Sequence, residues 1–156
     1  MAHNPAHPDW YIGDFIEEIK VEGDPRNVVH INTRLIRATG PEDAFEKAMA
    51  LGKESETEYS NRSGKRVQIF FRGLRQLCLV HEPLEHGAEV LWEEQIQVPQ
   101  EQIDGWIKAK EDLAAFQPEV FQPSTGPDYG CGEIIAEALK MVEKSKEKVV
   151  LPRRKA

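Results

Sequence analysis

One cysteine has neighbours that could give it chemistry. Cys131 stands between Gly130 and Gly132, directly before a segment whose pattern predicts a helix. A helix N-terminus favours the thiolate over the thiol, and flanking glycines leave a sulfur accessible. Cys131 is therefore our candidate for a reactive or redox-sensing thiol. The alternative is an unreactive cysteine in a flexible linker, because no histidine lies near it in the sequence to act as a base.

Two histidines close together invite a metal-binding interpretation. His81 and His86 enclose two glutamates, and His30 could join them across a sheet. Zinc-binding histidines on a helix are four residues apart, whereas these two are five apart in a strand-to-turn segment. The alternative, solvated turn residues, is favoured because ligand number and geometry are both unmet. We therefore predict no cofactor and no metal site. His81 and His86 are the weak candidates for metal ligands.

Charged side chains recur in segments that predict strands. Some of them could converge on one sheet face, either as a partner-binding surface or as an ordinary solvated face. Their spacing selects no catalytic pair, and the sequence has no phosphate-binding glycine loop, nucleophile elbow or Walker lysine. We therefore predict no catalytic residue and favour a non-enzymatic role. The residues concerned are Asp14, Glu17, Glu18, Glu89, Glu93, Glu94, Arg34, Arg37, Arg72 and Arg75.

The C-terminal part predicts an amphipathic helix over residues 132–146. Its apolar stripe must be buried somewhere, either on its own domain or on a second copy or another protein. The preceding Pro- and Gly-rich residues 117–131 predict a linker that gives the helix reach. The candidate partner-binding residues on this stripe are Ile134, Ile135, Leu139 and Val142.

Aromatic and β-branched residues predict a strand at 10–21, and alternating apolar residues predict a second strand at 28–38. A helix is expected at 41–52, opened by a capping box of Thr39 with Glu42 and closed by Gly52 in a left-handed cap.

The second half of the domain follows the same logic. A strand at 67–80 changes phase at Gly73, which predicts a bulge. A further strand is expected at 90–98, and Pro99 opens a second helix that runs to about Ala114.

These elements predict an α+β fold. We expect an antiparallel sheet of four to five strands in the order β-β-α-β-β(-β)-α, with helices on one face and the C-terminal amphipathic helix in addition. The expected organisation is a disordered segment 1–9, an α+β domain 10–116, the linker 117–131, the helix 132–146 and a basic tail 147–156.

Composition limits the classes of protein that fit. The 156 residues suit one domain. Two cysteines are too few for a disulfide framework, and neither an apolar run of eighteen residues nor a secretory signal is present, so we expect a cytoplasmic protein without a membrane segment. Residues 144–156 hold six basic residues and one acidic residue, so their net charge is +5. Because the whole chain has a net charge of −7, the residues before this segment carry a net charge of −12. An acidic body disfavours nucleic-acid binding outside the tail.

Short motifs in a fixed order resemble an uncharacterised bacterial family, domain of unknown function 4288, over residues 10–94. The resemblance implies no activity and no site residue. The motifs are Trp10-Tyr11, Ala44 with Lys47-Ala48, Leu51-Gly52, Tyr59-Ser60-Asn61 before Gly64, Phe71-x-Gly73-Leu74, and Gly87-x-Glu89-Val90.

Three functions stay open at this point. The first is a protein-interaction module, in the manner of an immunity protein or antitoxin, that binds a partner or a second copy. The second is a small-ligand-binding protein or enzyme with a pocket between sheet and helices. The third is nucleic-acid contact through the basic tail.

Overall fold

The computed structural model describes residues 9–117 and 125–148, with side chains to residue 145 in the final helix. Two compact units make up the chain. One combines the residues up to Val80 with those from Ser124 onward, and the other spans His81–Pro123. Of the segment predicted to be disordered, residues 1–8 lie outside the described residues, whereas Asp9 begins the first strand. The predicted basic tail 147–156 lies outside them from residue 149.

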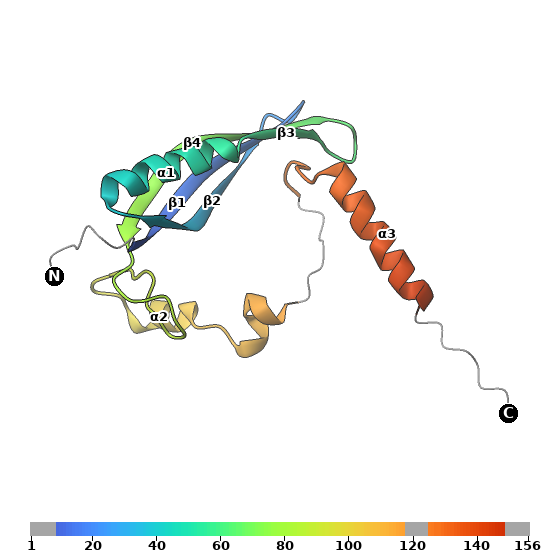
Figure 1. Ribbon diagram of the computed structural model, residues 1–156. Coiled ribbons are helices and arrows are strands. Elements are labelled where there is room, and N and C mark those ends of the chain that lie inside the picture. Colours follow the sequence, from blue (N-terminus) through green and yellow to red (C-terminus); the bar gives the residue numbers. More distant parts are fainter. Residues whose placement is uncertain (1–8, 118–124, 149–156) are drawn as a thin grey trace. The chain divides into compact units, whose positions relative to one another are not determined.

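The first unit is built on a four-stranded antiparallel sheet, shown in Figure 1. Its strands are β1 (Asp9–Val21), β2 (Asn27–Ala38), β3 (Thr57–Ser60) and β4 (Arg66–Leu79), in the order β2-β1-β4-β3. The predicted strands at 10–21, 28–38 and 67–80 are confirmed. The short strand β3 was not expected, because its polar sequence carries no clear alternation.

Strand β4 is irregular where the phase of its apolar residues changes. Asp14 faces Gln76 but Phe15 faces Leu74, so that Arg75 is an extra residue. A second extra residue, Arg72, lies just beyond Gly73, which has a φ of 135°. The predicted irregularity at Gly73 is therefore present as two bulges, one on each side of a glycine in a conformation that other residues rarely adopt.

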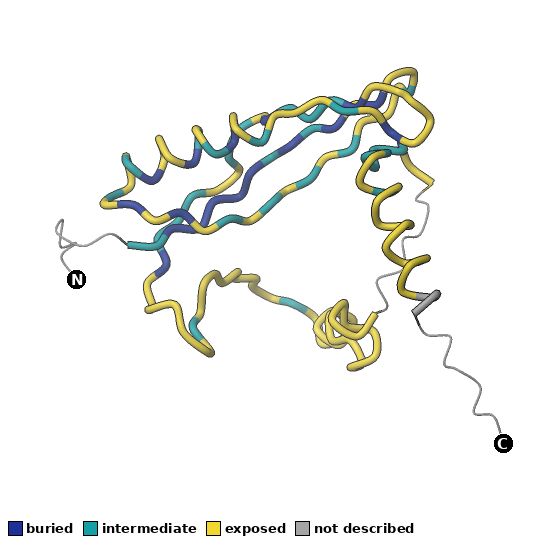
Figure 2. Tube along the Cα trace, turned by 45° about the vertical axis from the view of Figure 1, so that its right-hand side comes forward, coloured by how far each residue is buried: buried dark blue, intermediate teal, exposed yellow. Residues whose placement is uncertain are grey.

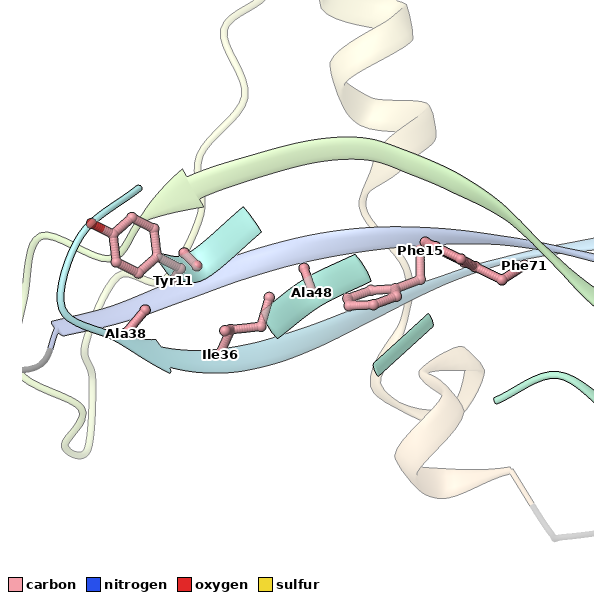
Figure 3. Packing of buried hydrophobic residues seen from close by; sticks show 7 residues of the cluster. Tyr11, Phe15, Ile36, Ala38, Ala48 and Phe71 are labelled. Atoms are coloured by element: carbon pink, nitrogen blue, oxygen red, sulfur yellow. The ribbon is translucent and has the colours of Figure 1, made fainter. Parts of the chain in front are cut away.

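Helix α1 (Pro41–Glu54) covers one face of the sheet. Its buried face consists of small residues, which lets the helix lie close to the strands. Gly52 belongs to this face, because a Cβ there would overlap the Phe71 ring. Figure 3 shows Phe15 and Phe71 beneath this helix. The buried core consists of Tyr11, Phe15, Ile36, Ala38, Ala44, Ala48 and Phe71.

The helix begins at residue 41 as predicted, but the capping predicted for both of its ends was wrong. Gly40 is the N-cap and no side chain caps it. Asp43, instead of Glu42, accepts hydrogen bonds from the Thr39 backbone N–H (2.8 Å) and hydroxyl (3.2 Å). The helix continues past Gly52 to end at Ser55. Residue 52 is a glycine because its side of the helix packs against the Phe71 ring, and not because the chain turns there.

The second unit is mostly irregular, and two predictions fail there. Residues 90–98 form no strand, since they pair with no other strand and Gln97 has a positive φ of 59°. The predicted helix from Pro99 to Ala114 is shortened to α2 (Gln100–Trp106), with two single turns at Lys110–Asp112 and Ala114–Phe116. Helices this short need tertiary packing, and no residue of α2 is buried.

Residues 125–131 return to the sheet and lead into α3 (Gly132–Lys148). Tyr129 packs on a second apolar cluster, formed by Ile19, Val21 and Val67, on the part of the α1-side face that lies beyond Phe71. Pro127 is buried as well. This half of the predicted linker is thus in contact with the sheet unit, and the C-terminal helix predicted at 132–146 is present.

Candidate protein-interaction surfaces

The start of α3 is fastened to the turn between β3 and β4. Asn61 is buried, and its Oδ1 accepts hydrogen bonds from the backbone N–H groups of Ser63 and Lys65, both at 2.9 Å. Its Nδ2 donates to the carbonyl oxygen of Asp128 at 2.9 Å. Gly132 approaches so closely that a Cβ there would lie 3.0 Å from the Asn61 carbonyl oxygen. One side chain therefore shapes the turn and holds the segment before α3.

Tyr129 adds a second attachment. Its carbonyl oxygen accepts a hydrogen bond from the Tyr59 hydroxyl, and its ring meets the His30 imidazole edge-on with centroids 5.4 Å apart. Burial raises the pKa of Tyr59 above its ordinary value of 10.0. Arg26 donates from Nη1 to the Thr125 carbonyl oxygen at 3.0 Å. Contacts on β2, β3 and two turns thus position the chain that enters α3.

Beyond this attachment, the apolar stripe of α3 is exposed. The exposed fractions are 66% for Ile134, 59% for Leu139 and 50% for Val142. Ile135 is half-buried, and with Leu139 it lines a groove of about 440 Å³ whose other wall is the β3–β4 turn. Figure 2 shows α3 exposed along most of its length after a partly buried start. The predicted partner-binding residues therefore share one helix face, and three of the four are accessible.

The cysteines occupy different environments. Cys131 is half-buried directly before α3, and its carbonyl accepts the hydrogen bond from the Ile135 N–H at 3.1 Å. Cys78 lies in β4 with its Sγ 3.9 Å from the Ile12 carbonyl oxygen. The reactivity of Cys131 stays a prediction.

The described histidines are His30, His81 and His86. Across the parts of the chain that the structure describes, no group of three or more His, Cys, Asp and Glu side chains could hold a metal ion. His30 contacts Tyr129, whereas His81 and His86 belong to the other unit.

Several of the charged residues named from the sequence form ion pairs, but on two faces of the sheet and not on one. We call the face opposite α1 the distal face. There Arg75 donates from Nη2 to Asp14 Oδ2 at 2.8 Å, and the Thr33 hydroxyl donates to Asp14 Oδ1 at 2.8 Å. Hydrogen bonds from Arg75 and Thr33 lower the pKa of the buried Asp14 below its usual 3.8. The bulges explain this contact, because they place the extra arginine beside the carboxylate.

The second bulge has a similar effect. Arg72 lies 4.0 Å from Glu18, whose pKa is lowered mainly by the hydrogen bond from Asn27 Nδ2. The adjacent groove of about 500 Å³ is lined by acidic and basic side chains together. Its carboxylates already accept hydrogen bonds from the chain, among them Glu22 from the Arg66 N–H. This pattern is typical of structural ion pairing.

On the α1 side, Glu17 separates the two apolar clusters of the sheet. It is buried and accepts hydrogen bonds from Asn32 Nδ2 at 2.9 Å and Arg34 Nη2 at 3.0 Å. The Arg34 guanidinium also lies 4.9 Å from the centre of the Phe15 ring. The sequence analysis named Glu17 and Arg34 together with the distal-face residues and did not predict that these two lie on the other face. Alternation along β1 places Glu17 on the face opposite Glu18, and the pairing of Gly13 with Arg34 brings Arg34 to the same face as Glu17.

The comparison with protein families identifies the part of the chain that belongs to a known family. The model of the family described as "Domain of unknown function (DUF4288)" matches residues 10–92, more than half of the chain, and the chain belongs to this family. The match includes all four strands and α1, and it ends before α3. No curated protein and no solved structure matches the chain. Among the described residues, no helix has the length and apolar character that a membrane crossing requires.

Proposed function

We propose that this protein is a non-enzymatic protein-interaction module whose α3 binds another protein. The observation that carries the proposal is the exposed apolar stripe of a helix whose entry is fixed by side-chain contacts. An amphipathic helix leaves such a stripe exposed at a cost in free energy, and a partner's groove removes that cost. An immunity- or antitoxin-like role is one form of this function.

Affinity purification from the native host tests the proposal. We expect the tagged protein to recover one partner in stoichiometric amount, and Leu139→Asp with Val142→Asp to lose that partner. The matched control is Ile96→Asp, which changes an exposed apolar residue in the other unit and is expected to retain the partner. Recovery of no stoichiometric partner at physiological salt, or equal recovery by all variants, would contradict the proposal.

The groove beside α3 supports a second candidate, a small-ligand site. Its volume of about 440 Å³ lies within the range of ligand pockets, and Ile135, Ala136 and Leu139 make one wall apolar. A ligand in this groove would protect Cys131, one residue from the groove residue Gly132, against alkylation. A protein partner on the exposed stripe would instead be lost on substitution of Val142, which does not line the groove.

A further inference from the structure

Strand β2 is a long edge strand with an apolar outer row. It is the first strand of the sheet order, so one of its edges has no neighbour among the described strands. Pro, Lys and bulges commonly protect edges, because an unprotected edge pairs readily with another strand, and β2 has no Pro, no Lys and no bulge against β1. Its charged residues are Arg37 and Arg34, which is bound to Glu17 on the α1 side. The opposite edge strand, β3, has only four residues. The edge of β2 is therefore the one suited to extended pairing.

The side chains of β2 on the distal face are exposed along the whole strand. Three of them are large and apolar, with exposed fractions of 51% for Val29, 44% for Ile31 and 48% for Leu35. Their neighbours on β1 in the same rows are Glu18, Ile16 and Ile12. The apolar rows of the sheet thus run outward to this edge.

We infer that β2 pairs antiparallel with β2 of a second copy, about a two-fold axis at Thr33. This inference concerns a different surface from α3 and is independent of the function proposed for that helix. In this register Thr33 faces Thr33, and Ile31 of each copy faces Leu35 of the other. The two sheets join into one continuous sheet with both distal faces on the same side.

The register between β1 and β2 shows why this pairing is self-complementary. Ile12 pairs with Leu35, and Ile16 pairs with Ile31. Joining the copies therefore creates two four-residue apolar rows, each running from Ile12 through Leu35 to Ile31 and Ile16 of the second copy. Cross-strand pairs of this kind are the main source of side-chain stabilisation within a sheet.

Charge complementarity supports the same register. Glu18 pairs with Val29 on β1 and β2, and the two-fold axis at Thr33 places Arg37 of the second copy opposite Val29. Arg37 and Glu18 then lie two strands apart, about 10 Å between backbones. Within one copy Arg37 lies 6.0 Å from the centre of the Trp10 ring and Glu18 accepts a hydrogen bond from Asn27, so the contact between copies requires Arg37 to turn from Trp10 toward Glu18. The symmetry repeats this contact. The polar row between the apolar rows holds Thr33 with Asp14, which the Thr33 hydroxyl already contacts.

Oligomeric state and cross-linking test the inference. We expect light scattering after gel filtration to give about twice the chain mass of 17.7 kDa, and Ile31→Glu with Leu35→Glu to give a monomer with an unchanged circular dichroism spectrum. Both residues are about half exposed, so the sheet core is not altered. Leu139→Asp, on α3, is expected to stay dimeric. A monomeric wild type, or loss of the dimer only in Leu139→Asp, would overturn the inference.

Cysteine cross-linking checks the register directly. In a background of Cys78→Ala and Cys131→Ala, we expect Thr33→Cys to form a disulfide-linked dimer under mild oxidation, because opposed residues have suitable Cβ separations. The matched control, Leu35→Cys, faces Ile31 and is expected to stay uncross-linked. Cross-linking of the control in place of Thr33→Cys would refute the proposed axis.

Discussion

Among single residues, Gly52 and Phe71 set how closely α1 approaches the sheet. Gly52 lies inside the helix, where glycine is normally less favourable than alanine by about 0.5–1 kcal/mol. The ring of Phe71 occupies the space that a Cβ would need. The glycine therefore contributes through packing, and its conformational freedom is not what the position requires.

We predict that Gly52→Ala lowers the free energy of unfolding by about 1–2 kcal/mol, since overpacking of a core costs about 1–3 kcal/mol and alanine recovers part of it through helix propensity. Urea unfolding followed by circular dichroism measures the change. The control is the same substitution in a Phe71→Leu background, where the removed ring leaves room and the added cost is expected to vanish. Equal stability of wild type and Gly52→Ala would contradict the packing described for this site.

Residue types alone predicted part of the charged pattern. Asp14, Glu18, Arg72 and Arg75 do converge on one face, as the sequence suggested. The opposite placement of Glu17 with Arg34 follows from alternation along β1, which the sequence contains. The contacts of the two β4 arginines depend on the bulges, and their positions follow from the pairing of two distant segments. Which residues of two distant segments pair is a property of the tertiary structure, and the local periodicity of the sequence does not contain it.

At the scale of elements, strands with strict alternation were predicted well. The alternation in β2 predicted the strand but not which face is buried, because Val29, Ile31 and Leu35 are exposed whereas the residues that alternate with them on the α1 side are half-buried or buried. The segment 90–98 has the same alternation but no partner strand, so its pattern alone could not produce a ladder. The Pro- and Gly-rich residues 125–131 failed in the opposite sense. Their composition predicted a linker that extends away from the domain, whereas a buried proline and Tyr129 hold them against the sheet.

We predict that Asn61→Asp loosens the attachment of α3 while preserving the β3–β4 turn. A carboxylate keeps both bonds accepted from Ser63 and Lys65, but it loses the donor to the Asp128 carbonyl and sets negative charge against it. An unsatisfied buried group costs about 1–3 kcal/mol, which corresponds to roughly a tenfold or larger change in an opening equilibrium. Hydrogen exchange of the amides at 129–139 measures this change.

The matched control is Ser60→Ala, a neighbouring exposed position with no bond to this segment. We expect its exchange at 129–139 to equal that of the wild type, with the β4 amides unchanged in both variants. Unaltered exchange in Asn61→Asp would show that Tyr59, Tyr129 and Arg26 hold the segment without Asn61.

At the scale of the whole molecule, the family match and the structural division do not coincide. The match ends at residue 92, inside the second unit, so it marks the sheet and α1 as the shared part and leaves α2 and α3 outside. Both surfaces proposed for binding belong to the first unit. The edge of β2 lies within the family match, whereas α3 lies beyond it. The partner binding proposed for α3 is thus located outside the part of the chain that the family match covers.

The second unit has too little buried surface to be stable by its own packing. Among residues 81–117, Ala88 and Val98 are the two that are not exposed, and the one α-helix there has seven residues. Isolated helices of that length are marginal in water.

We therefore predict that amides of 81–117 exchange at close to unstructured rates, while the amides of β1 and β4 exchange slowly because they belong to the paired centre of the sheet. Hydrogen exchange with mass spectrometry on the full chain measures both groups in one experiment. As an independent readout, a soluble quencher is expected to reach the exposed Trp92 and Trp106 freely. Strong protection of 81–117 in the isolated protein would contradict this prediction, since it would require buried contacts for side chains that are exposed here.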